Sequence, residues 1–361
     1  MTALRLTLAL LILASLYFTF WPVPVEPIAW DAPVDAGLVD PFSENDQLAK
    51  AKGIGLGKFH GPEDIVIGFD NLLYAATNDG NIISFQADGS DLKVFAVTGG
   101  RPLGMDYTGG FLYVANAYLG LQRIRRDGRV VVVADTFDGQ PIGYADDVAV
   151  AKDGTVYFTD ASSKFGAQSH GGSYEAAVLD LIEHGSHGRV LKYDPFNNET
   201  TLVLDQLDFA NGIAISEDQS YLLVNETGSY RVVRFWLEGP NAGTREIILD
   251  NLPGFPDNIN NGLHGRFWIG LIAPRDAVVD RYSNNPFVRK MMLRLPKALH
   301  PKAKLSSHLI AIDGGGNVLM NFQDTDASFP SITGAIETRD NLYLTSLFGN
   351  RIARLAKRDL R

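Results

Sequence analysis

The sequence predicts an all-β fold, a six-bladed β-propeller with four-stranded blades, preceded by one N-terminal helix. From about residue 58 onward, one pattern occurs six times: a polar residue, a short apolar run, a turn rich in Gly, Asp or Asn, and a second apolar strand. The copies lie about 40 to 75 residues apart and each continues into further strand-like segments, as β-meander blades do. Helical periodicity is scarce outside the N-terminus and two insertions. The copies are GPEDIVIGFDNLLYAATNDG, RPLGMDYTGGFLYVANAYLG, YADDVAVAKDGTVYFTDASS, FANGIAISEDQSYLLVNETG, FPDNINNGLHGRFWIGLIAP and SITGAIETRDNLYLTSLFGN.

Two packed β-sandwiches are the alternative all-β architecture, but they explain neither the number of copies nor their repetition. The 361 residues suffice for one large domain or two ordinary ones, and 45% of them are hydrophobic, so the chain can bury a core. We therefore expect residues 1–22 to form a signal anchor or signal peptide, residues 23–57 a linker and N-terminal strand, and residues 58–361 the propeller.

Residues 4–21 form a strongly apolar run that carries one charge, Arg5. The run is marginally long for a bilayer helix, which needs about 17–25 residues. Trp21 stands where interfacial aromatic residues occur, and Pro22 and Pro24 end the run. We expect an uncleaved transmembrane signal anchor, with the propeller exported to a periplasmic, lumenal or extracellular space. A cleaved signal peptide and a secreted protein are the alternative, although no clear Ala-x-Ala site follows the run.

The composition excludes several classes of protein. Because it has no cysteine, the chain has no disulfide, Cys-ligated zinc, iron–sulfur cluster or thiol catalysis. Its 32 Lys and Arg residues against 42 Asp and Glu residues give a formal net charge of −10, so nucleic acid is not an expected partner. The acidic surplus suits a bound cation instead.

Two insertions interrupt the repeat, at residues 164–187 and 274–304. The second mixes apolar side chains with basic ones and has no acidic residue between Asp280 and Asp313. A lid over a site, or contact of residues 281–304 with a membrane surface, would explain this mixture. A solvated helix that covers a blade edge explains it equally well. The basic residues are Arg281, Arg289, Lys290, Arg294, Lys297, Lys302 and Lys304.

One position of the repeat carries an oxygen-bearing side chain in four of the six copies. It lies eleven residues before a landmark in the second strand. Because the inner strands of a propeller start around its central axis, these side chains should converge there. The same count in copies two and six gives Pro102 and Ile332, so these two blades are expected to supply no charge. The four residues are Glu63, Asp146, Asn211 and Asp257, and Asn258 follows directly after the last.

Carboxylates and carboxamides crowded at one axis would repel each other and stay unsatisfied without a cation between them. Oxygen donors without His or Cys favour a hard ion, and this mixture suits Ca²⁺ better than Mg²⁺. Turn-capping Asp and Asn is the alternative for any single residue, but it does not explain four at one offset. We therefore expect a calcium site, with a purely structural ion as the remaining alternative. Its ligands would be Glu63, Asp146, Asn211, Asp257 and Asn258.

Catalysis at such a site would start from a calcium ion with open positions, which polarises a carbonyl or phosphoryl oxygen and holds a water. Asp257 or Asp146 could act as base or nucleophile beside it. A serine nucleophile is poorly supported because the chain has no Gly-x-Ser-x-Gly motif. His184, in the first insertion, is a weaker acid–base candidate because a lone loop histidine is more often a solvated bystander.

Six segments carry a resemblance to known proteins: LYVANAYLGL, TVYFTDASSKF, GRVLKYDP, FANGIAISEDQSYLLVNETGSYRVVRFWLEGPNAG, DNLPGFPDNI and ITGAIETRDNLYLTSLF. They resemble the strictosidine synthase-like family, in the branch that contains adipocyte plasma membrane-associated protein. The larger superfamily includes gluconolactonases, paraoxonases and diisopropylfluorophosphatase. The resemblance covers roughly residues 55–355 and is most specific between Phe209 and Ile259. It implies a six-bladed propeller with axial calcium, and arylesterase or lactonase activity in several members.

The resemblance also assigns the calcium ligands residue by residue. The superfamily's calcium residues fall on Glu63, Asn211, Asp257 and Asn258. Asp146 stands where an Asn is usual, which keeps an oxygen ligand and adds a negative charge.

Two departures from the family pattern restrict the expected chemistry. The catalytic glutamate of true strictosidine synthases aligns with Thr333, so Pictet–Spengler condensation is not expected. The paraoxonase-type histidine aligns with Leu103, so that acid–base arrangement is missing too. The remaining resemblance is to a calcium site in an apolar pocket. The residues expected to line it are Leu103, Asn116, Tyr118, Tyr144, Thr333 and Phe348.

Two functions from different classes follow. The first is an exported, membrane-anchored, calcium-dependent hydrolase of small apolar esters or lactones, in which calcium polarises the carbonyl and a carboxylate activates water. The second is a non-catalytic, membrane-anchored propeller that binds a ligand or partner and holds a structural calcium.

Overall fold

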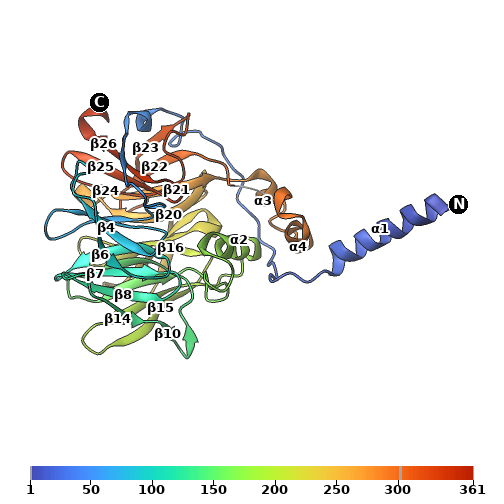
Figure 1. The fold of residues 1–361 in the computed structure, drawn as a ribbon, viewed down its shortest axis with the longest axis horizontal. Coiled ribbons are helices and arrows are strands. Elements are labelled where there is room, and N and C mark those ends of the chain that lie inside the picture. The colour runs from blue at the N-terminus through green and yellow to red at the C-terminus, as the bar shows by residue number, and fades with distance from the viewer. Residues whose placement is uncertain (1, 301–302, 361) are drawn as a thin grey trace.

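The computed structural model describes residues 2–300 and 303–360, and it confirms the predicted six-bladed propeller. Figure 1 shows the propeller from the side, with helix α1 projecting to the right. Six antiparallel four-stranded sheets form the ring. The first three are β2 (Ile65–Ile67), β3 (Leu73–Ala76), β4 (Asn81–Phe85) and β5 (Lys93–Val97); β6 (Pro102–Thr108), β7 (Phe111–Asn116), β8 (Gly120–Arg125) and β9 (Val130–Ala134); and β12 (Ala145–Val150), β13 (Val156–Asp160), β14 (Gly188–Asp194) and β15 (Glu199–Leu207).

The last three blades complete the ring, and the N-terminal strand closes it. Strand β1 (Lys52–Gly55) pairs antiparallel with β26, with Lys52 opposite Arg354. This pairing covers what would otherwise be an exposed sheet edge. The strands are β16 (Ala210–Ile215), β17 (Tyr221–Glu226), β18 (Arg231–Trp236) and β19 (Arg245–Leu249); β20 (Gly254–Asn261), β21 (Phe267–Pro274), β22 (Ser307–Ile312) and β23 (Val318–Asp324); and β24 (Ile332–Glu337), β25 (Asn341–Ser346) and β26 (Arg351–Ala356) with β1. A short hairpin, β10 (Thr136–Phe137) and β11 (Gln140–Pro141), precedes the third blade.

The hydrophobic core lies between neighbouring blades, because each sheet buries both faces against the next. One cluster joins Ile65 and Ile83 of the first blade to Tyr343 and Ile352 of the last, so the closure is packed as well as hydrogen-bonded. Equivalent clusters fill the other five interfaces. Large aromatic residues of the second strands, such as Tyr74, Trp268 and Tyr343, belong to these clusters and therefore pack between blades.

Five of the six inner strands carry an irregularity of register at their axial ends. The pairing shifts between Pro102 and Met105, and at the corresponding points of β12, β16, β20 and β24. A β-bulge adds an unpaired residue and re-aims its side chain. At Gly104, a Cβ would lie 2.6 Å from Asp147 Cα, so only glycine allows the second and third blades to approach this closely. The bulges turn the predicted ligand positions toward the axis.

A second set of carboxylates, Asp64, Asp106 and Asp147, ties neighbouring blades to each other. Met105 N donates to Asp64 Oδ2 at 2.8 Å, Val150 N to Asp106 Oδ2 at 2.7 Å, and Ile213 N to Asp147 Oδ2 at 2.8 Å. Each bond joins one blade to the next. Met105 and Ile213 lie at the register shifts of β6 and β16, so Asp64 and Asp147 satisfy backbone donors at these irregularities.

The two insertions form helices over one face of the ring, the same side from which α1 projects (Figure 1). They contain α2 (Ser173–Glu183), α3 (Ala277–Arg281) and α4 (Pro286–Arg294). Asn285 Oδ1 accepts the backbone N–H of Val288 and so caps α4. Together with linker residues 23–34, these helices are called the cap below. Lys302, part of the basic segment noted in the sequence, lies outside the described residues.

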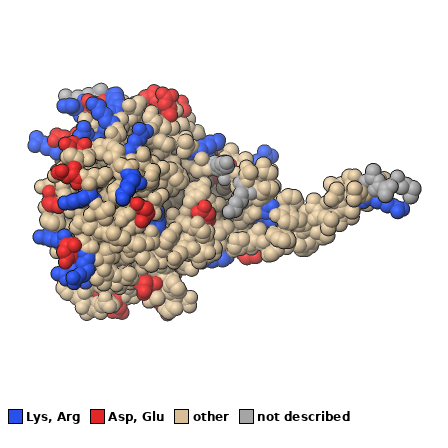
Figure 2. All heavy atoms as spheres, in the orientation of Figure 1, with Lys and Arg blue, Asp and Glu red and all other residues tan. Residues whose placement is uncertain are grey.

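The N-terminal helix α1 (Thr2–Phe20) is confirmed as a helix. Figure 2 shows it as a rod almost free of acidic and basic side chains, unlike the mixed charges of the propeller. Within residues 2–300 and 303–360, however, the helices are too short or too polar to qualify as membrane spans. Membrane anchoring therefore stays a prediction.

Candidate active site

Four of the five predicted ligands form the floor of one cavity on the propeller axis. Glu63, Asp146, Asn211 and Asp257 line this cavity, whose volume is about 220 Å³. Asn258, the fifth, is fully buried beside them. Glu63 comes from just before β2, and the others come from the inner strands β12, β16 and β20. Residues from four blades thus meet at one place, as the repeat predicts.

Amide groups fix the directions of these side chains. Asn211 Nδ2 donates to Asp257 Oδ1 at 2.7 Å, and Asn258 Nδ2 donates to the Glu63 carbonyl oxygen at 3.2 Å. Asn225 Nδ2 donates to the Asp257 carbonyl oxygen at 2.6 Å and holds the bulge of β20 from the neighbouring blade. Because each amide nitrogen is used, each ligand amide leaves its oxygen available as an acceptor.

The acceptor oxygens of this cluster are buried and lack hydrogen-bond donors. Within residues 2–300 and 303–360, no three His, Cys, Asp or Glu side chains form a group that holds a metal by themselves. The cluster nevertheless has four unpartnered buried oxygens, two of them on asparagines: Glu63 Oε2, Asn211 Oδ1, Asp257 Oδ2 and Asn258 Oδ1. A buried acceptor without a donor costs about 1–3 kcal/mol. Carboxylate and carboxamide oxygens together are a donor set that fits Ca²⁺.

Burial and mutual repulsion disfavour the charged forms of the three carboxylates. Burial raises the pKa of Asp257 to about 7, although the Asn211 hydrogen bond and Arg101 lower it. Burial and then repulsion from Asp257 raise the pKa values of both Glu63 and Asp146 well above their ordinary values. Perturbed carboxylates at the base of a cavity are typical of functional sites.

The expectation that the second blade supplies no charge is wrong. Arg101 stands one residue before β6, its side chain is buried at 5% exposure, and its charge acts on the axial carboxylates. Counting back eleven residues in the second copy gives Pro102, so the count missed Arg101, which lies one residue earlier. The sequence feature that could have revealed this charge is the arginine directly before the apolar start of the strand, in RPLGM.

The cavity wall is apolar and comes from both the propeller and the cap. Leu103, Tyr144 and Phe348, all predicted for the pocket, lie on this wall. Tyr144 is held by a hydrogen bond from its hydroxyl to the Ser173 carbonyl oxygen at 2.7 Å, which links the axis to α2. The cap and neighbouring blades contribute the other apolar wall residues, among them Trp30, Ala177, Val178, Leu181, Ile182, Phe209, Phe255, Met292 and Leu293.

Three other residues predicted for the pocket lie outside the wall that the described residues form. Asn116 is fully buried and accepts the Arg101 backbone N–H at 3.0 Å and that of Tyr118 at 3.1 Å. Thr333 Oγ1 donates to the Glu63 carbonyl oxygen at 2.6 Å. Asn116 and Thr333 therefore hold the backbone of neighbouring residues, and no acid or base occupies the Thr333 position.

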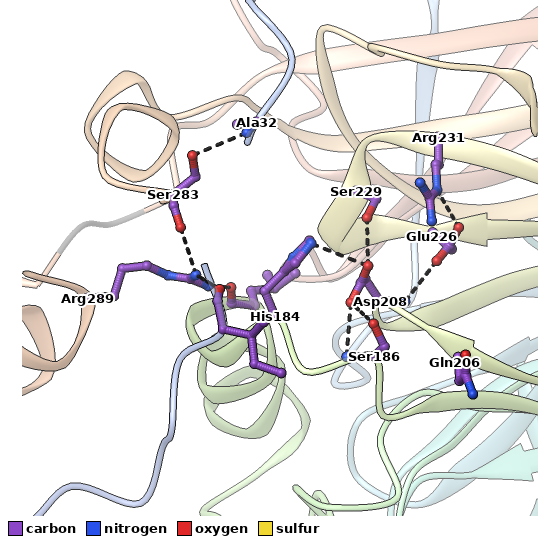
Figure 3. A network of polar contacts seen from close by, with 12 residues as sticks. Ala32, His184, Ser186, Gln206, Asp208, Glu226, Ser229, Arg231, Ser283 and Arg289 are labelled. Atoms are coloured by element: carbon purple, nitrogen blue, oxygen red, sulfur yellow. Dashed lines mark hydrogen bonds and ion pairs between the residues drawn. The ribbon is translucent and has the colours of Figure 1, made fainter. Parts of the chain in front are cut away.

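His184 is not brought to the cavity. It ends α2 with a left-handed backbone, stacks on Trp30 with ring centroids 3.9 Å apart, and lies 3.3 Å from Asp208 Oδ2. Figure 3 shows the His184 ring directed at Asp208, which also accepts hydrogen bonds from Ser186 and Ser229. Burial lowers the pKa of His184 to about 4, so its ring is neutral at pH 7. Trp30 stands between this network and the cavity.

Two basic residues of the second insertion, Arg289 and Arg294, are buried and hold the N-terminal part of the chain against α4. Arg289 Nη1 donates to the Ile28 carbonyl oxygen at 2.6 Å and holds the linker against α4. Arg294 Nε donates to the Trp21 carbonyl oxygen at 2.7 Å and thus binds the end of α1. The side chains of these two basic residues are therefore used within the protein.

Comparison with known proteins identifies the family. The family described as strictosidine synthase matches residues 146–240, and the family described as strictosidine synthase-like, N-terminal, matches residues 40–85. The Arabidopsis thaliana protein strictosidine synthase-like 4 is 32% identical over 336 residues, which cover 90% of this chain and 88% of that protein. The chain belongs to the strictosidine synthase-like family. The resemblance predicted from the sequence is therefore confirmed.

An animal protein is also similar over nearly the whole chain. The adipocyte plasma membrane-associated protein of Bos taurus is 28% identical over 382 residues, covering 98% of this chain and 89% of that protein.

Solved structures share the fold at low sequence identity. A gluconolactonase from Xanthomonas campestris has a TM-score of 0.61 at 18% identity, covering 93% of this chain and 99% of that chain. A calcium-binding protein, regucalcin, from Agrobacterium tumefaciens has a TM-score of 0.59 at 11% identity, covering 84% and 93%.

Proposed function

We propose that this family member is a calcium-dependent hydrolase of small apolar esters or lactones. The observation that carries the proposal is the group of buried, unpartnered carboxylate and carboxamide oxygens at the floor of an apolar cavity. The fold similarity to a gluconolactonase and to a calcium-binding regucalcin supports both the metal and the reaction class. Pictet–Spengler chemistry is not proposed, because Thr333 offers a hydroxyl where that reaction needs a glutamate.

The proposed calcium ligands are the four residues with unpartnered oxygens: Glu63, Asn211, Asp257 and Asn258. When bound there, calcium would supply a Lewis acid for the carbonyl oxygen of the substrate. Asn211 and Asn225 serve this site by fixing the Asp257 side chain and backbone.

Asp146 is the proposed general base. It lines the cavity, and none of the hydrogen bonds described for the chain reaches its carboxylate, whereas Asp257 is held by Asn211. Asp146 takes a proton from a water molecule as the water oxygen bonds to the substrate's carbonyl carbon. The acyl C–O bond then breaks, and the same proton passes to the departing alkoxide. For an ester the products are an acid and an alcohol, and for a lactone one hydroxy acid.

The cavity wall selects the substrate. Leu103, Tyr144 and Phe209 surround the floor, and α2 and α4 cover it. A flat or medium-chain apolar group fits such a wall, because its burial contributes about 25 cal/mol per Å² of apolar surface. A strongly polar sugar lactone finds few hydrogen-bond partners there.

We also propose that α1 holds the propeller at a membrane on the exported side, with a secreted form as the alternative. The exposed side chains Leu8, Leu11 and Leu13 support this proposal, as do relatives described as plasma membrane-associated. The Tyr17 hydroxyl donates to the Arg294 carbonyl oxygen at 2.9 Å, so α1 is joined to α4 at the cap. Residues 281–304 would then lie near the membrane surface.

A non-catalytic propeller with a structural calcium is the second candidate. The observation that favours it is the bonding between blades at the cluster: Asn211 joins β16 to Asp257 of β20, and Asn258 joins β20 to the start of the first blade. An ion at this point would pin three blades together while the cavity held a ligand or partner group.

The deciding experiment measures hydrolysis by the purified full-length chain in detergent. Phenyl acetate, a medium-chain lactone and a sugar lactone are tested with Ca²⁺ and with a chelator. We expect turnover of the first two, its loss on chelation, and at least a hundredfold lower rate in Asp146→Asn with the melting temperature retained. Calcium binding without turnover of any substrate in a broad ester and lactone panel would leave only the second candidate.

A further inference from the structure

Arg101 is a buried cation in a part of the propeller that otherwise gathers acids. Its backbone is fixed on both sides: Arg101 N donates to Asn116 Oδ1 at 3.0 Å, and Ala117 N donates to the Arg101 carbonyl oxygen at 2.8 Å. Its Nη1 donates to the Gly61 carbonyl oxygen at 3.2 Å, two residues before Glu63. The guanidinium is therefore held beside the first-blade ligand.

The charge of Arg101 acts on all three axial carboxylates. It favours the charged forms of Glu63, Asp146 and Asp257 against the effect of burial. No salt bridge within 4.0 Å joins it to any of them among the described residues, so it does not occupy their oxygens. It also lies outside the cavity wall as described, so a bound substrate would not touch it.

A buried guanidinium costs several kcal/mol to desolvate unless opposite charges surround it. One hydrogen bond to a carbonyl could be made by a neutral side chain at much lower cost. The position of Arg101 is thus best explained by its charge. Counted formally, the buried side chains of Glu63, Asp146, Asp257 and Arg101 carry three negative charges and one positive charge, which is a net charge of −2.

We propose that the positive charge of Arg101 makes the axial site prefer a divalent cation over a trivalent one. With Arg101 present, one divalent ion brings the buried cluster to neutrality. Without it, the cluster carries one more negative charge and suits a trivalent ion of similar size. Arg101 is a specificity-determining residue for the metal, and the inference rests on the calcium site of the proposed function.

The test is a double-mutant cycle on metal selectivity. The full-length protein in detergent is titrated calorimetrically with Ca²⁺ and with La³⁺, in the wild type and in Arg101→Met, Asp146→Asn and the double variant. Arg101→Met should raise the La³⁺-to-Ca²⁺ affinity ratio about tenfold or more, because each added charge attracts a trivalent ion more strongly. Asp146→Asn should lower the ratio by a similar factor, and the double variant should return it to near the wild-type value. Arg101→Lys, which keeps the charge, should leave it unchanged.

Several outcomes overturn the proposal. If Arg101 only stabilises the fold, Arg101→Met weakens both ions by the same factor and Asp146→Asn does not compensate. If Arg101→Met does not fold, Arg101→Gln takes its place in the cycle, and an unchanged La³⁺-to-Ca²⁺ ratio in that variant contradicts the proposal. A wild type that binds neither ion removes both this inference and the calcium part of the proposed function. If the affinity ratios change as predicted but no ester or lactone is hydrolysed, this inference stands and only the proposed reaction is overturned.

Discussion

Removal of calcium should destabilise the propeller by an amount that follows from its unpartnered oxygens. The four buried oxygens at the axis lack donors, and each costs about 1–3 kcal/mol, so an ion has several kcal/mol of unfavourable free energy to offset. At a free calcium concentration a hundred times its Kd, the net stabilisation is about 2.7 kcal/mol. For a domain of this size, that corresponds to a rise in melting temperature of about 5 °C.

The assay is thermal unfolding of the full-length protein with a chelator, Mg²⁺ or Ca²⁺. We expect the rise with Ca²⁺, a much smaller one with Mg²⁺, and its loss in Asp257→Asn. The rise should shrink between pH 8 and pH 5.5, because calcium binds the deprotonated form of Asp257, whose pKa without metal is about 7. An unchanged melting temperature at saturating calcium, in a wild type shown to be folded, would refute this interpretation of the unpartnered oxygens.

Three other predictions follow from particular contacts. Asn225→Ala should weaken calcium binding about tenfold, as measured by calorimetry, because it frees the Asp257 backbone without removing a ligand. Unchanged affinity would mean that the β20 bulge keeps its conformation without the Asn225 hydrogen bond. His184→Ala should keep the rate of ester hydrolysis within about twofold of wild type, because the histidine stacks on Trp30 outside the cavity. The loss of this stacking should lower the free energy of unfolding by about 1–3 kcal/mol. A loss of turnover at unchanged KM would instead indicate a catalytic role for His184. Burial raises the pKa of Asp180 from 3.8 to about 7, so the folded state binds more protons than the unfolded one and the contribution of Asp180 to stability falls as the pH rises from about 4 to 7. Denaturant unfolding of Asp180→Asn should lack this decline, and an identical pH profile in both proteins would contradict it.

The fold was predictable because the repeat leaves a local signature in each blade. The landmark residues of the second strands pack between blades, and the axial position lies eleven residues before each of them. Asp146, Asn211 and Asp257 could thus be found by counting, and the structure places them together at the cavity floor.

The rest of the site depends on contacts between blades that no single copy displays. Arg101 precedes the counted position, and Asn225 lies near the end of β17, the second strand of the blade whose ligand is Asn211. The partner of each lies in another blade, so spacing within a copy gives no signal. The cap is similar: Trp30 lines the cavity while the linker beside it is held by the second insertion, through Arg289 at Ile28 and Ser283 at Ala32. The position of His184 also has no signal in the sequence, because its stacking on Trp30 depends on how the linker folds over α2.

A crystal structure of the full-length protein grown with calcium tests the central claim most directly. The proposed function predicts one calcium ion on the propeller axis, bound by Glu63, Asn211, Asp257 and Asn258, with Asp146 facing the cavity and at least one coordination position open to it. An axis that holds only water at saturating calcium, or an ion whose ligands fill every position, would contradict it.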